Sequence, residues 1–237
     1  MICVNDIKKH ILKWVIYLRE YKTLMIVMFF LSVFCFGRVN AIVRDYSLLG
    51  KCIYIDPGHG GRDSGAISST FYEKDMNLLL SKKLEKELLS KGAIVFMTRD
   101  GDYDLSESTI NKKRDDLYRR VIMINHSGCD MYVSMHLNAS PSSKWNGIQI
   151  FYSSILDENL NVANIVSDTL KKNMRNVRDV KRENGYYMYS KIKVPGILIE
   201  AGFVSNHNDN YKLRQEEYQD ILVRNISLGI ENYFHSK

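Results

Sequence analysis

IYIDPGHGGRD, residues 53–63, joins a short run of β-branched and aromatic residues to a turn rich in proline and glycine that carries one histidine, His59. An apolar run that stops at such a turn is typical of a buried strand, and glycine lets the backbone pass close to a bound group. We therefore expect a strand that ends in a loop. His59 becomes a candidate ligand or catalyst, although a lone histidine in a glycine turn is more often an ordinary loop residue.

Two later segments repeat the pattern of a strand that ends in a reactive side chain. The run 132–135 leads into His136, and the run 196–199 leads into Glu200. Such side chains meet only where their strands share a sheet and a direction, and in open α/β sheets the functional crevice lies outside the carboxyl ends of the strands. The pattern favours a parallel core, and it makes His59 and His136 stronger candidates for a ligand or catalytic role.

Glu73 completes a candidate metal site at the start of a helical pattern. Two histidines and one carboxylate are a standard ligand set for catalytic zinc. The alternative is that Glu73 only complements the helix dipole, because acidic residues stabilise a first turn without any metal. Glu200 has an alternative role in a surface ion pair, but a carboxylate that emerges from a core strand is costly unless it serves a site.

Four motifs in this order resemble one known family. DPGHGGRDSGA, the pair Glu73-Lys74, SMHLNAS and ILIEAGFVSN are similar to motifs of the zinc-dependent N-acetylmuramoyl-L-alanine amidases, the Amidase_3 family, and the match runs from about residue 51 to the C-terminus. The resemblance implies Zn²⁺ held by His59, Glu73 and His136, with Glu200 as the general base. Leu137 and Cys129 depart from the usual alanines of the family, but neither is a proposed ligand.

The resemblance also implies a fold and a substrate. The fold is α/β, a three-layer α/β/α sandwich with a central, mostly parallel (mixed) sheet. The substrate is peptidoglycan, cut at the amide between N-acetylmuramic acid and L-alanine. Asn138 and Asn206 lie beside the motifs and are secondary candidates for substrate binding. Two other functions stay open, namely a non-catalytic muropeptide-binding module and another zinc hydrolase of the wall, such as a carboxypeptidase or deacetylase.

Helical and strand patterns alternate through the chain. Strands separated by helices indicate a parallel or mixed sheet covered on both faces. The helical patterns cover 73–91, 110–126, 156–176 and 216–234, and further strand patterns cover 93–97, 147–152 and 186–189.

The N-terminus has the pattern of a targeting segment. An apolar run, 24–36, follows several basic residues, and its thirteen residues are fewer than the about 20 that span a bilayer. This length fits a signal peptide with a weak cleavage site at 39–41, and an uncleaved membrane anchor is the alternative. We expect a leader over 1–41 and a single catalytic domain over 42–237, exported to the outer face of the cytoplasmic membrane or to the cell wall.

The net charge of the chain and the order of its segments indicate which partners it binds. The formal net charge is +6, but the leader holds six Lys/Arg against two Asp/Glu, so only +2 belongs to the remainder. We therefore expect no nucleic-acid partner. A leader followed by one catalytic domain resembles the sporulation-type amidases, which implies spore cortex maturation and a place in the intermembrane space of the developing spore. The segment 157–172 leaves no room for the long autoinhibitory helix of some cell-division relatives, so we expect a separate activator protein.

Two of the four cysteines, Cys52 and Cys129, lie outside the leader. They lack the paired spacing of thiolate zinc sites and are most simply small buried apolar residues. A disulfide between them is the alternative.

Overall fold

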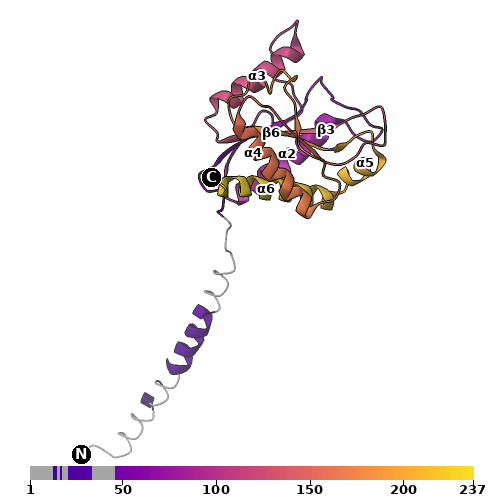
Figure 1. Ribbon diagram of the computed structural model, residues 1–237. Coiled ribbons are helices and arrows are strands. Elements are labelled where there is room, and N and C mark those ends of the chain that lie inside the picture. Colours follow the sequence, from indigo (N-terminus) through magenta and orange to yellow (C-terminus); the bar gives the residue numbers. More distant parts are fainter. Residues whose placement is uncertain (1–12, 15–16, 18–20, 34–45) are drawn as a thin grey trace, which may run out of the picture. The chain divides into compact units, whose positions relative to one another are not determined.

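The computed structural model describes residues 13–14, 17, 21–33 and 46–237 (Figure 1). The chain divides into two units between Arg44 and Asp45. Residues 21–33 of the first unit are helical. Within the described residues, no helix combines the length and apolar character needed to cross a membrane. The predicted cleavage site at 39–41, like the end of the apolar run, lies outside the described residues.

The second unit is built on one six-stranded sheet with the strand order β2-β1-β3-β6-β4-β5. The neighbours β2, β1, β3 and β6 run parallel, whereas β4 is antiparallel to β6 and parallel to β5. The predicted mixed, mostly parallel sheet is confirmed. The strands are β1 (Cys52–Pro57), β2 (Ile94–Met97), β3 (Met131–Asn138), β4 (Gln149–Tyr152), β5 (Lys181–Arg182) and β6 (Gly196–Phe203).

Side chains alternate between two cores on the two faces of the sheet, as the period of a strand requires. Ile53 and Ile55 of β1 enter the larger core with α2, α4 and α6. Tyr54, between them, enters the smaller core with α3 and the segment 188–194. This division gives the predicted three layers (Figure 1). The helices are α2 (Glu73–Ser90), α3 (Lys112–His126), α4 (Asp157–Asn173), α5 (His207–Leu213) and α6 (Glu216–His235).

The predicted strand over 186–189 is wrong. These residues form a helical turn, in which the backbone N–H of Ser190 donates to the carbonyl of Tyr186 and that of Ile192 donates to Met188. The turn buries Met188 and Tyr189 in the smaller core. A short aromatic run has no clear period, so its sequence does not distinguish a strand from a turn that packs equally well.

Cys52 and Cys129 form a disulfide, so the simpler interpretation as separate apolar residues is wrong. Cys52 begins β1 and Cys129 lies just before β3, and these two strands are paired in the sheet. The bond therefore joins the amino ends of two parallel neighbours. Disulfides of this kind persist in oxidising compartments, outside the cytosol.

We expect removal of this disulfide to lower the free energy of unfolding by about 4 kcal/mol, because it closes a long loop in the unfolded chain. The bonded residues are 77 positions apart. Urea denaturation of the double variant Cys52→Ala/Cys129→Ala measures the effect. A reductant should lower the midpoint of the wild type and leave that of the variant unchanged. An unaltered midpoint in the variant would contradict the expectation.

Candidate active site

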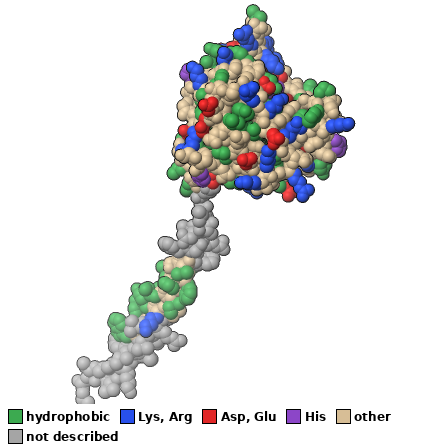
Figure 2. Space-filling model, in the orientation of Figure 1, with side chains coloured by type: hydrophobic (Ala, Val, Ile, Leu, Met, Phe, Trp, Pro, Cys, Tyr) green, Lys and Arg blue, Asp and Glu red, His purple; other side chains and the backbone are tan. Residues whose placement is uncertain are grey.

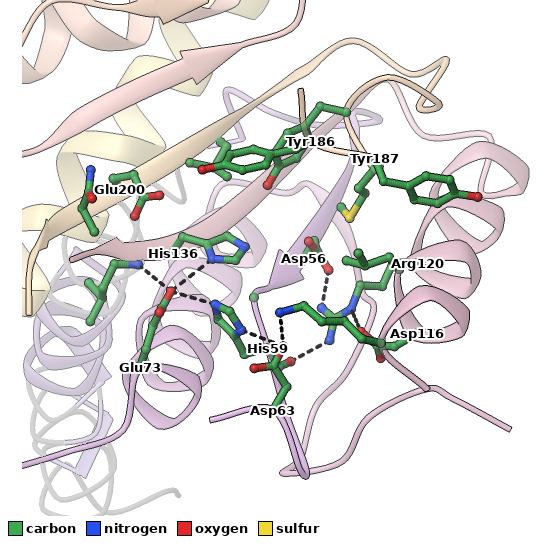
Figure 3. Close-up of a pocket in the computed structure, with 18 of the residues that line it drawn as sticks. Asp56, His59, Asp63, Glu73, Asp116, Arg120, His136, Tyr186, Tyr187 and Glu200 are labelled. Carbon is green, nitrogen blue, oxygen red and sulfur yellow. Dashed lines mark hydrogen bonds and ion pairs between the residues drawn. The ribbon is translucent and has the colours of Figure 1, made fainter. Parts of the chain in front are cut away.

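The carboxyl ends of three parallel strands deliver the predicted residues to one cavity (Figure 3). His59 follows β1 after one turn residue, His136 lies near the end of β3, and Glu200 sits beside His136 in the register of β6. Glu73 is the first residue of α2. The cavity has a volume of about 380 Å³ and all four residues line it.

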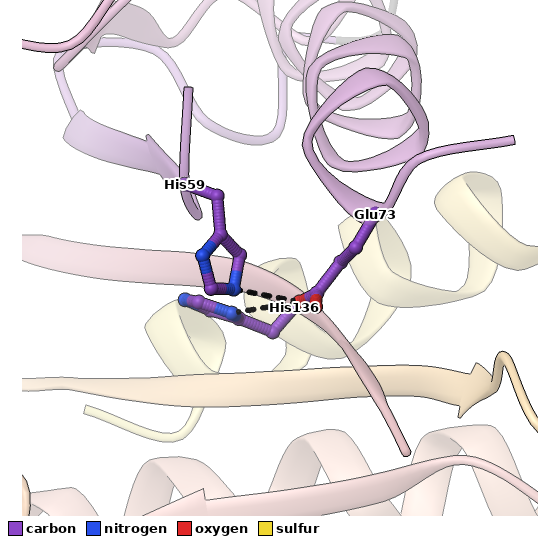
Figure 4. Close-up of side chains that lie close together, drawn as sticks. All are labelled: His59, Glu73 and His136. Carbon is purple, nitrogen blue, oxygen red and sulfur yellow. Dashed lines mark hydrogen bonds and ion pairs between the residues drawn. The ribbon is translucent and has the colours of Figure 1, made fainter. Parts of the chain in front are cut away.

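Three of these side chains form a compact cluster (Figure 4). The Nε2 atom of His59 and the Nδ1 atom of His136 each lie 3.1 Å from the same carboxylate oxygen, Oε1 of Glu73. The candidate ligand atoms of the three residues lie within 4.8 Å of one another. This arrangement could hold a metal ion.

Backbone and side-chain donors fix the carboxylate of Glu73. The N–H of Leu137 donates to Oε1 at 3.0 Å and the N–H of Ala66 donates to Oε2 at 2.8 Å. Burial by itself would raise the pKa of Glu73, but hydrogen bonds from His136 and His59 outweigh it and hold that pKa well below its usual range. Glu73 is therefore an ionised acceptor.

His59 is held from both sides of its ring. Its Nδ1 atom lies 3.0 Å from Oδ2 of Asp63, opposite the contact with Glu73. Burial lowers the pKa of His59, but the hydrogen bonds to these two carboxylates prevail and raise it to about 9. The surroundings of His59 thus favour positive charge.

Glu200 is buried and lacks a partner for one oxygen. Its side chain is only 9% exposed, and its Oε2 atom makes no hydrogen bond with any described residue. Burial, then the negative charge of Glu73, raises the pKa of Glu200 to about 8. A carboxylate in such surroundings binds protons strongly, as a general base near neutral pH must.

Comparison with known proteins identifies the family. Residues 53–232 match the model for Amidase_3, described as N-acetylmuramoyl-L-alanine amidase. The chain belongs to the Amidase_3 family. Its enzymatic class is therefore that of the N-acetylmuramoyl-L-alanine amidases, as the motifs predicted.

Related amidases agree in sequence and in structure. The germination-specific N-acetylmuramoyl-L-alanine amidase of Bacillus subtilis (strain 168) is 41% identical over 95% of this chain and 96% of its own length. The CwlD amidase of Clostridioides difficile, solved in complex with the GerS lipoprotein, matches with a TM-score of 0.75 and 34% identity, over 79% of this chain and 100% of that one. An N-acetylmuramoyl-L-alanine amidase of Clostridium difficile 630 matches with a TM-score of 0.71 and 35% identity, over 79% of this chain and 98% of that one.

Asp63 of the amidase was missed by the sequence analysis. A carboxylate that accepts from the second ring nitrogen of a histidine ligand orients the ring and raises its basicity. The signal was present, because Asp63 follows His59 by four positions in the same motif. The spacing alone did not indicate a role for Asp63, because acidic residues are common in turns.

Two buried arginines, also missed, hold the loop of the amidase that carries His59. Arg120 donates to the carbonyls of Pro57 at 2.8 Å and His59 at 2.6 Å, and it pairs with the buried Asp56 at 2.7 Å. Arg99 donates to the same Pro57 carbonyl at 3.1 Å. His59 has a φ of 62°, which is unusual for a residue other than glycine, and these hydrogen bonds keep it there.

Gly65 of the amidase lies against two side chains of the cluster, Glu73 and His59. Its φ is +65°, and a Cβ atom there would lie 2.6 Å from Oε2 of Glu73 and 2.7 Å from Cδ2 of His59. Any larger residue would displace at least one of these two side chains.

We therefore expect Gly65→Ala to weaken zinc binding at least about tenfold, as disturbed support of ligands usually does. Gly128→Ala is the matched control, because Gly128 has a φ of +69° and no described atom within 4 Å of the added Cβ. Both variants should lose about 1–2 kcal/mol of stability from the backbone. Competition with a chromogenic zinc chelator measures the affinities, and equal zinc affinity in the two variants would contradict this role of Gly65.

The two asparagines predicted to bind substrate have different surroundings in the structure. Asn138 lines the cavity at the end of β3. Asn206 is instead the N-cap of α5, where its side chain accepts from the N–H groups of Asn208 and Asp209 and donates to the carbonyl of Ser143. Its side chain is thus committed to a structural role, and we no longer assign Asn206 to substrate binding.

Proposed function

We propose that this amidase is zinc-dependent and hydrolyses the amide between the lactyl group of N-acetylmuramic acid and L-alanine of the stem peptide in peptidoglycan. The observation that supports it most is the cluster of His59, Glu73 and His136 beside the unpartnered carboxylate of Glu200. A muropeptide-binding module would not need a buried carboxylate at that position, because binding requires no proton transfer.

The donor set fits zinc. Two imidazoles and one carboxylate form a ligand set that zinc accepts in catalytic sites. His59, Glu73 and His136 would hold the ion. When bound, zinc supplies Lewis acidity, which polarises a carbonyl and lowers the pKa of water.

Glu200 would carry the proton transfers. Its carboxylate faces the cavity, so it can accept a proton from the attacking water and then donate it to the departing amine of L-alanine. Asn138 would contact the substrate from the lining of the same cavity. The ionised Glu73 and the Asp63 carboxylate would keep His59 in place during these steps.

We also propose a cellular setting. Residues 1–41 would act as a signal peptide or membrane anchor and residues 42–237 as one catalytic domain. The amidase would act outside the cytoplasmic membrane, a location that suits the disulfide. The germination-specific relative of Bacillus subtilis supports a role connected with germination. We propose that this role is spore cortex maturation, in the space between the spore membranes. The complex of the Clostridioides difficile relative with a lipoprotein supports a separate protein partner.

The test is digestion of purified spore and vegetative sacculi by the full-length, zinc-loaded chain, followed by mass spectrometry. We expect release of intact stem peptides with a free L-alanine amine. Release of D-alanine would indicate a carboxypeptidase, and release of acetate a deacetylase. Binding to sacculi without any release, with and without a candidate lipoprotein partner, would indicate a binding module.

A further inference from the structure

Most hydrogen-bonding side chains around the catalytic cavity are already engaged. Arg120 contacts Asp56, Asp116 and two backbone carbonyls. The hydroxyl of Tyr189 donates to Oγ of Ser134 at 3.4 Å. None of these groups can turn to a substrate without breaking a contact inside the protein.

Tyr186 differs from these residues. It lines the cavity, but its hydroxyl makes no hydrogen bond with the part of the chain that the structure describes. Its ring packs edge-on against Tyr189 with the centroids 5.7 Å apart, which holds it in the cavity wall although 52% of the residue is exposed. Figure 3 shows Tyr186 over the cavity, on the side of Glu200 and across from His59 and Glu73.

Burial and the nearby negative charges keep the proton of Tyr186 in place. Burial and then the negative charges of Glu200, Glu183 and Glu73 raise the pKa of Tyr186 above its ordinary value. The hydroxyl is therefore a neutral donor at any physiological pH and cannot act as a base. Tyr186 and Glu200 line the same cavity, and neither Tyr186 nor another described residue donates to Oε2 of Glu200.

We propose that the Tyr186 hydroxyl donates a hydrogen bond to the oxygen of the scissile carbonyl as this oxygen becomes an oxyanion. The inference rests on the proposed amide hydrolysis. When water adds to the carbonyl carbon, the pair of electrons of the C=O π bond moves to oxygen, and a preorganised donor stabilises the charge. Tyr186 keeps its proton throughout, and Glu200 alone transfers one. Tyr186 is then a catalytic residue beside Glu200 and the metal ligands.

The neighbouring tyrosine provides a matched control. Tyr187 also lines the cavity, but its ring points away from the metal-ligand cluster toward α3 (Figure 3), where the guanidinium of Arg114 lies 5.9 Å from its centroid. Tyr186→Phe and Tyr187→Phe each remove one hydroxyl from the same turn. Only the first removes a donor on the Glu200 side of the cavity.

The experiment compares both variants with the wild type as full-length, zinc-loaded proteins. Tyr186→Phe should lower kcat about 10²-fold, the usual effect of losing one oxyanion donor, with KM and zinc content unchanged. Calorimetry supplies a second readout, using a muropeptide analogue in which a phosphinate replaces the scissile carbonyl. This tetrahedral anion should bind Tyr186→Phe about 10²-fold more weakly, whereas Tyr187→Phe should match the wild type in both measurements.

Three outcomes would overturn the inference and leave the proposed function intact. These are a Tyr186→Phe enzyme with wild-type kcat, an effect on KM alone, and equal losses in both variants, which would indicate disturbed packing of the turn. A wild type that releases no stem peptide would instead reject the proposed function, and the role of Tyr186 with it.

Discussion

Glu200→Gln is expected to leave zinc bound and to lower kcat/KM by about 10³-fold, close to 4 kcal/mol of transition-state stabilisation. The amide of glutamine has nearly the same shape as the carboxylate, but it cannot accept a proton from water. Glu200 is not one of the three clustered ligands, so the metal-ligand set stays complete. Loss of turnover with full zinc content would separate proton transfer from metal binding.

Glu200→Gln should lower activity but raise the stability of the metal-free protein at high pH. Burial raises the pKa of Glu200 in the folded protein to about 8, above the value in an unfolded chain. The folded state therefore favours the protonated form, and metal-free protein loses stability as pH rises through that pKa. Glutamine is neutral at every pH, so metal-free Glu200→Gln should be more stable than the wild type above about pH 8.

Steady-state kinetics, elemental analysis and urea denaturation at several pH values measure these effects. Glu217→Gln is the control, since Glu217 is an exposed acid in the first turn of α6. Full turnover by Glu200→Gln would remove this residue from the mechanism. Loss of zinc from the variant would instead place Glu200 among the ligands.

His136→Ala and His59→Ala are each expected to reduce zinc from one equivalent to a trace and to abolish hydrolysis. Each removes one of only two imidazoles and leaves two ligands, too few for a stable catalytic site. The loss of affinity should exceed the about 10–100-fold that follows from losing an outer partner. Asp63→Asn supplies that intermediate case, because Asp63 contacts the His59 ring at Nδ1, the nitrogen that does not face Glu73.

Elemental analysis after dialysis measures the zinc content of these variants, and chelator competition ranks them by zinc affinity. His207→Ala is the control, since His207 lies exposed at the start of α5. The expected order of affinity is wild type and His207→Ala, then Asp63→Asn, then the two ligand variants. Full zinc content in either His59→Ala or His136→Ala would contradict the site.

Short-range patterns were enough to predict the architecture and the chemical groups of the site. The helix that begins at Glu73 was predicted over 73–91 and is observed over 73–90, because its apolar residues recur at the helical period. The three strand ends with His59, His136 and Glu200 were likewise visible, since parallel strands bring their carboxyl ends to one edge.

Tertiary packing decided what supports these groups. Arg120 reaches Asp56 and the His59 loop from a helix that is distant in sequence, and Cys129 reaches Cys52 in the same way. The turn that places Tyr186 over the cavity was predicted as a strand. Periodicity and motifs describe a residue and its near neighbours, whereas the partners of a buried side chain depend on which surfaces meet when the layers close.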